Sequence, residues 1–141
     1  MKKTMFLLLF AASFGFSQEW HTNLEKAKTA AKEKHQHIIL VFSGSDWCAP
    51  CMKLEHEVLH TKRFQDYSKA HYTLLKADFP RRKKNALPEA QQTHNNSLAE
   101  QYNKQGYFPL VVVLDEDGTA LGETGYVKST PQDFIDLLNA F

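Results

Sequence analysis

A short apolar run followed at once by two closely spaced cysteines constrains this chain more than any other feature. Residues 37–43 read HIILVFS, and such a continuous run of apolar and β-branched residues predicts a strand buried on both faces. Residues 48–51 read CAPC, and the apolar residues after them recur at helical spacing: Leu54, Val58 and Leu59. We therefore expect the cysteine pair to open a helix directly after a buried strand.

The other apolar patterns place further helices and strands around this unit. Spacing and capping residues predict a short helical turn from Thr61 and three longer helices, over 22–35, 97–106 and 130–141. A second strand is predicted over 71–77, and residues 110–126 read as an antiparallel hairpin. Because strands and helices alternate before the hairpin, we expect an α/β fold with a central mixed β-sheet flanked by helices.

Signals for helix ends are clear near the C-terminus and weaker before it. Thr130 can cap the last helix, Pro131 suits its first position, and the residues expected to face inward are Phe134, Leu137, Leu138 and Phe141. Gly106 is the expected stop of the preceding helix. Residues 80–96 are polar and contain two prolines, so no regular element is predicted there.

The N-terminus has the pattern of a secretory signal peptide. Two lysines precede an apolar run over residues 5–12, and the small residues Gly15 and Ser17 lie two apart. We expect residues 1–17 to be removed by cleavage after Ser17, with an uncleaved membrane anchor as the alternative. Residues 18–141 then form one domain, located in the periplasm or elsewhere outside the cytoplasm.

Charge gives no argument for a nucleic-acid partner. The chain has 17 Lys and Arg residues against 16 Asp and Glu residues, and removal of the signal lysines leaves it close to neutral. One basic run covers residues 81–84, and we interpret it as a solvated loop rather than a docking patch. No nucleic-acid partner is expected.

The two cysteines favour redox chemistry over a structural bridge, because a disulfide across so few residues barely restrains the unfolded chain. Cys48 lies at the start of the predicted helix, where unpaired N–H groups and the helix dipole stabilise a thiolate. We expect Cys48 to be the more exposed sulfur and the attacking one, and Cys51 to resolve the mixed disulfide. Trp47 shapes an edge beside them, and Pro50 is tolerated in the first helical turn.

Three further residues bear on the chemistry of the cysteines. Glu55 lies four residues beyond Cys51 on the same helical face, so it is either a proton acceptor for Cys51 or an exposed helix glutamate. Asp46 is interpreted as a surface residue, because its charge opposes thiolate formation. Pro109 precedes a strand, and frequency alone favours a trans peptide bond there.

Taken together, WCAPC between a strand and a helix, and FP before the strand LVVVLD, resemble the thioredoxin superfamily. The resemblance covers nearly the whole of residues 18–141. Within the superfamily, the chain is most similar in pattern to exported bacterial thioredoxin-like proteins. It implies a thioredoxin fold and thiol-disulfide oxidoreductase activity, with Cys48 as nucleophile and Cys51 as resolving thiol. It also implies that Pro109 is a cis proline facing the sulfurs, which replaces the trans expectation.

The same resemblance extends to substrate, partners and direction of reaction. Substrate-binding residues would be Trp47, Ala49, Pro50, Phe108 and Pro109. We expect a periplasmic disulfide reductase, because the Ala-Pro dipeptide offers no histidine to stabilise the thiolate and so favours a reducing couple. Its partners would be disulfide-containing exported proteins and a membrane electron donor, and no cofactor is expected.

The chain departs from the family pattern at three positions. Phe42 stands where thioredoxins carry a buried aspartate, so the usual proton acceptor is missing unless Glu55 substitutes for it. Phe108 replaces a small or β-branched residue before the cis proline, and Ala49 replaces a glycine.

Alternative functions remain open on sequence grounds. Cys48 and Cys51 could act with His56 and His60 in a copper or zinc chaperone, although four such ligands do not easily converge from one helix. An oxidase or isomerase of the same fold would use the same two cysteines, whereas in a partner-binding module the cysteines would matter little.

Overall fold

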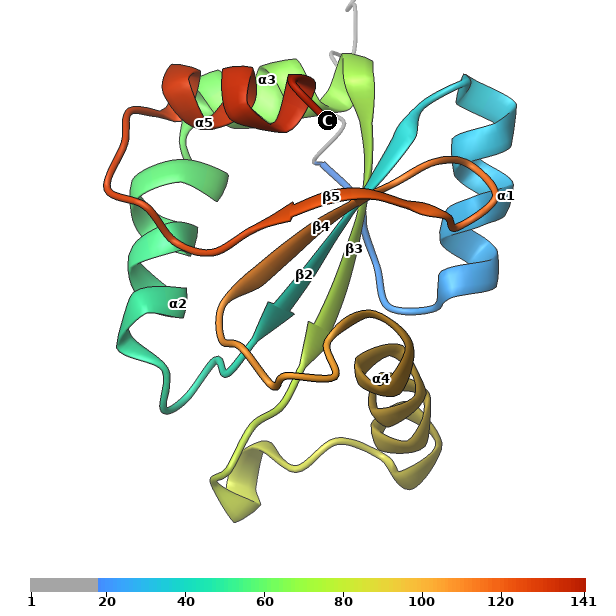
Figure 1. The fold of residues 1–141 in the computed structure, drawn as a ribbon. Helices are drawn as coiled ribbons and strands as arrows, with labels where there is room; N and C mark the ends of the chain where they lie inside the picture. Colours follow the sequence, from blue (N-terminus) through green and yellow to red (C-terminus); the bar gives the residue numbers. More distant parts are fainter. Residues whose placement is uncertain (1–17) are drawn as a thin grey trace, which may run out of the picture.

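A five-stranded mixed sheet forms the centre of the protein, with strand order β1-β3-β2-β4-β5 (Figure 1). The computed structural model describes residues 18–141, so the predicted signal peptide lies outside the described residues. The strands are β1 Trp20–His21, β2 His37–Ser43, β3 Tyr72–Asp78, β4 Leu110–Leu114 and β5 Ala120–Thr124. β1, β3 and β2 are parallel, whereas β4 and β5 are antiparallel to their neighbours, which confirms the predicted mixed sheet.

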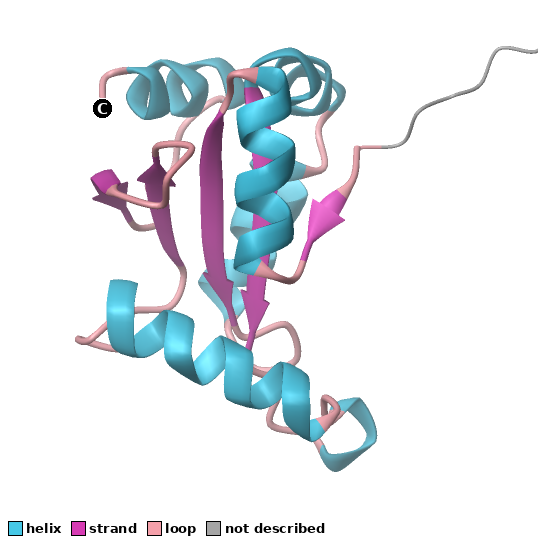
Figure 2. Ribbon diagram, turned by 90° about the vertical axis from the view of Figure 1, so that its right-hand side faces the viewer, coloured by secondary structure: helices cyan, strands magenta, loops and turns pink. Residues whose placement is uncertain are grey.

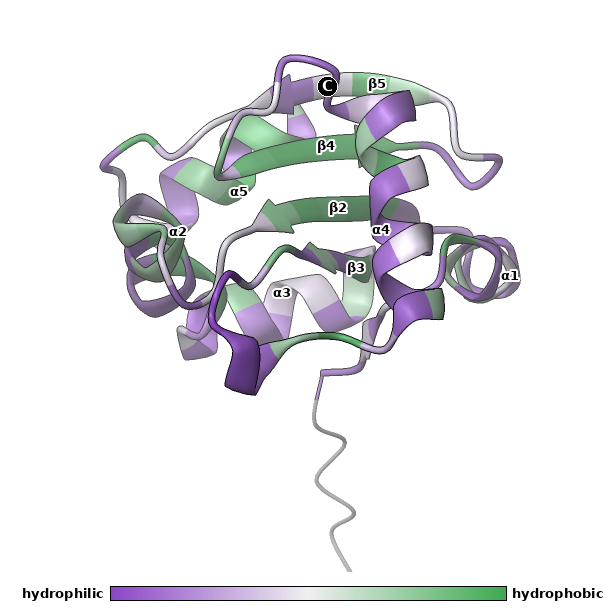
Figure 3. Ribbon diagram, turned by 90° about the horizontal axis from the view of Figure 1, so that it is seen from below, coloured by the Kyte–Doolittle hydropathy of each residue, from purple (hydrophilic) through white to green (hydrophobic). Residues whose placement is uncertain are grey.

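Helices cover both faces of this sheet. They are α1 Leu24–Lys34, α2 Ala49–Leu54, α3 Lys62–His71, α4 Glu89–Tyr102 and α5 Pro131–Asn139, with a π-helical turn η1 Glu55–Leu59 and a 3-10 turn η2 Lys83–Asn85. Figures 2 and 3 show α2, α3 and α5 on one face and α1 and α4 on the other. No helix in residues 18–141 is both long and apolar enough to span a membrane.

Successive side chains of β2 point to opposite faces of the sheet, and both faces are buried, which explains why the strand is apolar throughout. Ile39 and Val41 pack into one buried cluster with residues of α2, α3 and α5, whereas the cluster on the opposite face contains Ile38, Leu40 and Phe42. β3 and β4 flank β2 on its two edges. The prediction of a strand buried on both faces is confirmed.

Side-chain caps fix where three helices begin. The N–H of Lys26 donates to Asn23 Oδ1 at 3.0 Å, and the N–H of Phe64 donates to Thr61 Oγ1 at 3.3 Å. Thr130 caps α5 as predicted, and it forms a capping box with Asp133. The helix from Thr61 is longer than the short turn expected, since α3 extends over 10 residues.

The helix α4 differs from its predicted bounds at both ends. It begins at Glu89, eight residues before the predicted start, because amide side chains rather than an apolar stripe attach its first half: buried Asn95 donates to the carbonyl of Asp78 at 2.9 Å. It ends at Tyr102, since Asn103 hydrogen-bonds the backbone N–H and carbonyl of Tyr107 and turns the chain. Gly106 has a φ of 70° and lies within that turn instead of ending the helix.

Two further details were not predicted correctly. The strand β1 was not anticipated, because its two residues become a strand only by pairing with β3. The buried residues of α5 are Phe134, Ile135 and Leu138, whereas Leu137 is only partly buried. Phe141 is 40% exposed, and its ring lies over the backbone of Gly122, where a Cβ atom would come within 2.2 Å of it.

Phe42 provides a test of the core. We expect Phe42→Ala to lower the free energy of unfolding of residues 18–141 by about 3–5 kcal/mol, the usual cost of the lost burial and of the cavity. Denaturant unfolding followed by circular dichroism measures this. The exposed Val127→Ala serves as control and should change stability by less than about 0.5 kcal/mol; an equally small change for Phe42 would contradict its placement.

Candidate redox site

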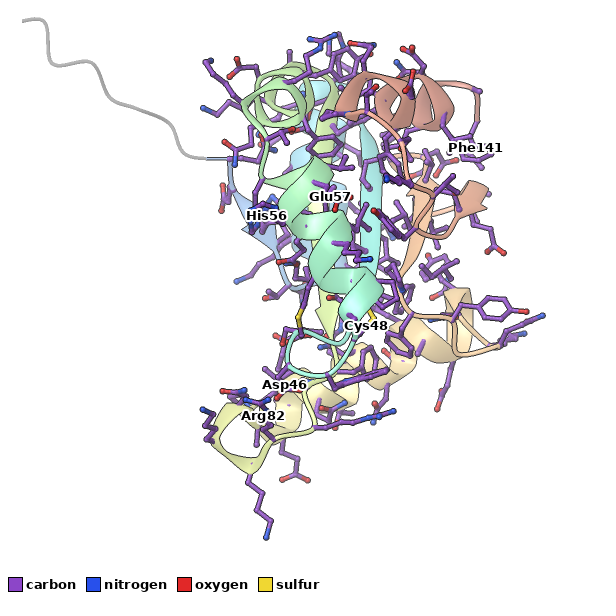
Figure 4. The ribbon with its side chains drawn as sticks, turned by 90° about the vertical axis from the view of Figure 1, so that its left-hand side faces the viewer. Asp46, Cys48, His56, Glu57, Arg82 and Phe141 are labelled. Atoms are coloured by element: carbon purple, nitrogen blue, oxygen red, sulfur yellow. A yellow bond between two sulfur atoms is a disulfide. The ribbon has the colours of Figure 1, made fainter. Side chains whose placement is uncertain are left out.

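A disulfide between Cys48 and Cys51 lies at the first turn of α2, directly after the end of β2 (Figure 4). Cys48 is the N-cap residue, and its Sγ accepts a hydrogen bond from the backbone N–H of Cys51 at 3.3 Å. The predicted strand-to-helix junction is therefore present. The helix start points an N–H donor at the sulfur of Cys48.

The two sulfur-bearing residues differ only slightly in exposure. Cys48 is 4% exposed and Cys51 is 1% exposed, so their order is as predicted, but Cys48 is itself a buried residue in this oxidised form. The accessible surface of the motif comes from its neighbours Ala49 and Pro50, which are exposed in the first turn, and from Met52. The first turn of α2 is therefore the part of the motif that is accessible at the surface.

Trp47 is held in place by backbone atoms of Phe79 and Gly44. Its indole N–H donates to the carbonyl of Phe79 at 2.7 Å. Its ring lies against Gly44, where a Cβ atom would come within 2.3 Å of the indole, so only glycine fits at that position. The half-buried indole thus forms a fixed wall beside Cys48.

Phe108 and Pro109, immediately before β4, lie next to Trp47. The peptide bond between them is cis, and Pro109 is buried while Phe108 is partly exposed. The Phe108 ring meets the Trp47 ring edge-on at 5.4 Å and the Phe79 ring at 5.5 Å between centroids. This aromatic contact places the segment before β4 next to the cysteine motif.

Glu55 is not a free surface glutamate. Its carboxylate accepts a hydrogen bond from the ammonium of Lys76 on β3, its Oε2 lies 3.7 Å from Nε2 of His60, and its side chain is 23% exposed. Its backbone N–H donates to the carbonyl of Cys51, which places the two residues one turn apart on one helix. Lys76, the only charged residue between Tyr72 and Ala77, was missed on sequence grounds, although that position in an apolar strand was a signal.

Phe42, which replaces the family's aspartate, is fully buried on the α1 and α4 face of the sheet. The next residue, Ser43, follows Val41 by two and so belongs to the face that α2 covers. Among residues 18–141, its hydroxyl is the one buried side-chain oxygen or nitrogen without a hydrogen-bond partner.

Asp46 attaches a distant loop to the cysteine motif. Its carboxylate accepts from the backbone N–H groups of Arg81 and Arg82 at 2.9 and 3.0 Å and from the side-chain amide of Asn85 at 2.9 Å. These bonds, led by the Arg81 N–H and the Asn85 amide, lower the pKa of Asp46 from 3.8 to about 2. The guanidinium of Arg81 lies 3.6 Å from the centroid of the Trp47 ring. Sequence reasoning found Asp46 only as a surface residue.

A metal site finds no support in the described part of the chain. No group of three or more His, Cys, Asp or Glu side chains in residues 18–141 is placed to hold an ion. Cys48 and Cys51 are bonded to each other, His56 is exposed, and His60 lies beside Glu55.

Comparison with known proteins agrees with the fold and the cysteine pair. The family described as the thioredoxin-like domain matches residues 24–141. The chain therefore belongs to the thioredoxin-like family, and its two cysteines, Cys48 and Cys51, are joined by a disulfide. This is the family that its motifs resemble.

One curated relative and two solved structures illustrate the similarity. The chain is 35% identical over 108 residues to the disulfide bond reductase DsbH of Chlamydia pneumoniae, a match that covers 77% of this chain but only 63% of that protein. A solved structure of DsbH oxidoreductase matches with a TM-score of 0.79 and 28% identity, over 99% of this chain and 92% of that one. The reduced C-terminal domain of Neisseria meningitidis DsbD, at a TM-score of 0.59 and 23% identity over 83% and 92%, shares the fold.

The anchoring by Asp46 can be tested by titration. Because the pKa of Asp46 is depressed in the folded state, its contribution to holding the loop is complete above pH 3.8 and is lost as the pH falls through about 2. We expect NMR titration of the carboxyl to give a midpoint near 2. Asp46→Ala should speed hydrogen exchange of the Arg81 and Arg82 amides by about tenfold at neutral pH, since each loses a charge-assisted hydrogen bond.

The control is Asp66→Ala, which removes an exposed carboxylate paired with Lys62 on α3. It should leave the exchange of the Arg81 and Arg82 amides unchanged. Equal exchange in the wild type and Asp46→Ala would show that Asp46 does not hold the loop.

Proposed function

We propose that this protein is a disulfide reductase that attacks substrate disulfides with Cys48 and resolves with Cys51. The observation that carries the proposal is the hydrogen bond from the Cys51 N–H to Cys48 Sγ at the start of α2. In the dithiol form the same donor, together with the helix dipole, stabilises a thiolate on Cys48.

The reaction balances over two thiol-disulfide exchanges. The Cys48 thiolate bonds to one substrate sulfur and releases the other as a thiolate, which forms a mixed disulfide. Cys51 loses its proton and attacks Cys48 Sγ, which releases the second substrate sulfur. Two electrons pass to the substrate, the two protein thiols become the Cys48–Cys51 disulfide, and the two protons end on the substrate thiols.

Two observations support reduction over oxidation. Ala49 and Pro50, between the cysteines, supply no histidine or cation to stabilise the thiolate further, and a less stabilised dithiol form is the more reducing one. A single hydrogen bond to the thiolate is enough to change the reduction potential measurably, because about 1.4 kcal/mol corresponds to about 30 mV for a two-electron couple. The similarity to a protein named a disulfide bond reductase points the same way.

The substrate surface we propose consists of Trp47, Ala49, Pro50, Phe108 and Pro109. Ala49 and Pro50 are exposed above the disulfide, and the Trp47 and Phe108 rings in contact form one side of the approach. An extended substrate segment would lie along the residues before β4, with its disulfide at the first turn of α2.

Glu55 is proposed as the proton acceptor for Cys51. The residue lies one helical turn after Cys51, and the Lys76 ammonium on β3 pairs with its carboxylate and holds it against the sheet. Lys76 lies two residues after Leu74, whose side chain packs with α2, so the pair lies on the face of the sheet that α2 covers. Glu55 on the helix would thus serve as the proton acceptor in place of the strand aspartate, whose position is occupied by Phe42.

Export completes the proposal. Residues 1–17 would act as a signal peptide that delivers residues 18–141 to the periplasm, where disulfide-containing exported proteins are the substrates. Because that compartment is oxidising, the dithiol form must be regenerated by a membrane electron donor.

The assignment of the two cysteines is tested by trapping. We expect Cys51→Ser to accumulate a mixed disulfide with a disulfide-containing peptide, because the resolving thiol is gone, and Cys48→Ser to trap none. Mass spectrometry under non-reducing conditions measures both, and the double variant is the control. Trapping through Cys51 alone would reverse the assignment.

The direction of reaction is tested by equilibration with glutathione. We expect a dithiol-disulfide potential more reducing than about −180 mV, the value of protein disulfide isomerase. A potential near that of a strong oxidant, about −120 mV, would make the protein an oxidase.

The role of Glu55 predicts a defect in the second step only. Glu55→Gln should slow release of the substrate from the mixed disulfide by about a hundredfold, the low end of what a positioned acid-base group contributes, and flatten its pH dependence. Rapid-quench kinetics separates this step from the initial attack by Cys48, which should be unaffected. Glu57→Gln is the matched control, since that carboxylate lies in the same turn and binds the Tyr126 hydroxyl; equal slowing in both variants would remove Glu55 from the mechanism.

A further inference from the structure

A basic loop lies next to the cysteine motif. It consists of Arg81, Arg82, Lys83 and Lys84, all of them exposed, and it includes the start of the 3-10 turn η2. None of the ion pairs found within residues 18–141 involves any of these four cations. Figure 3 shows η2 among the most hydrophilic parts of the surface.

The loop is fixed relative to the disulfide from two sides. Asp46 binds the backbone of Arg81 and Arg82, and Arg81 stacks on Trp47, the residue before Cys48. Figure 4 shows Asp46 and Arg82 together beyond the end of α2 that carries Cys48. The backbone of the loop is therefore held next to the two residues that precede Cys48.

The acidic groups around the loop do not cancel its charge by direct pairing. Asp46 accepts from two backbone N–H groups and one amide, and Asp78 accepts from the N–H and hydroxyl of Ser45 at 2.9 and 2.6 Å. Glu89, at the start of α4, is exposed and forms no ion pair in the described part of the chain. The side chains of Arg82, Lys83 and Lys84 remain available to a partner.

We propose that the basic loop is a docking surface for an acidic segment that flanks the disulfide of the protein substrate. This inference rests on the proposed function, because the partner must bring a disulfide to Cys48. A protein partner fits better than a nucleic acid, since the chain as a whole is nearly neutral and the cations are confined to one short loop beside the redox site. The loop does not have to become ordered on binding, because Asp46 already holds it.

The expected consequence is a charge preference among substrates. Opposite charges at the rim of a binding site accelerate encounter and lose that effect in salt. Substrates with acidic flanks should therefore have the higher kcat/KM through a lower KM.

The experiment uses the protein of residues 18–141 and three peptides, each with one disulfide, flanked by four Glu, four Gln or four Lys residues. We expect wild-type kcat/KM to be about tenfold higher for the Glu peptide than for the Gln peptide at low ionic strength, with the ratio approaching one at 0.5 M salt. The variant Arg82→Gln, Lys83→Gln, Lys84→Gln should bring the ratio close to one. The variant Arg82→Glu, Lys83→Glu, Lys84→Glu should reverse the preference toward the Lys peptide.

The matched control replaces three exposed lysines on other elements, Lys26 and Lys34 of α1 and Lys69 of α3, with Gln. Figure 1 shows α1 and α3 well away from the loop. This control has the same net charge as the first variant and should keep the preference for the Glu peptide.

Two results would overturn the proposal: equal kcat/KM of the wild type for the Glu and Gln peptides, or loss of the preference in the control, which would assign it to net charge. The comparison of the Glu and Gln peptides uses the wild-type protein alone, so the proposal can be tested even if a variant misfolds. Failure of the proposed function is distinguishable, because then none of the three peptides is reduced.

Discussion

The site depends on one junction, the point where a strand buried on both faces ends and a helix begins with a cysteine as its cap. β2 is paired with β3 and β4 on its edges and packed between apolar clusters on its two faces, so its end is held from every side. The first turn of α2 follows from that fixed end, and the N–H of Cys51 is aimed at Cys48 Sγ as a result. A preorganised donor at the sulfur requires a rigid element on each side of the motif, and the buried strand supplies the first.

Around this junction, the walls of the site come from segments far apart in the sequence. Trp47 is held by the carbonyl of Phe79 after β3, and its ring meets Phe108 before β4. Asp46 holds the backbone of residues 81–82. Asp46 and Trp47, the two residues before Cys48, are thus both tied to the loop after β3, so the same contacts shape this edge of the redox surface and position the basic loop.

The proton chemistry of the site has a similar origin in tertiary pairing. A carboxylate on the helix, Glu55, meets an ammonium on the neighbouring strand, Lys76, on the face that α2 covers. Phe42 meanwhile fills the opposite face with an apolar side chain. The chain therefore combines a fully apolar strand beneath the motif with an ion pair alongside it.

The sequence by itself determined the elements whose signals are local: the apolar run of β2, the cysteine pair at a helix start, the turn of the hairpin and the capping box at Thr130. The resemblance of its motifs to a known family predicted two further features that were then found, namely the family itself and the cis peptide bond before Pro109. Only the tertiary structure decided the strand β1, the true extent of α4, the burial of Cys48 and the partners of Asp46 and Glu55. Local patterns report burial periodicity and capping within a few residues. The strand β1, the start of α4 and the partners of Asp46 and Glu55 depend instead on contacts between residues at least 17 positions apart, which no local pattern encodes.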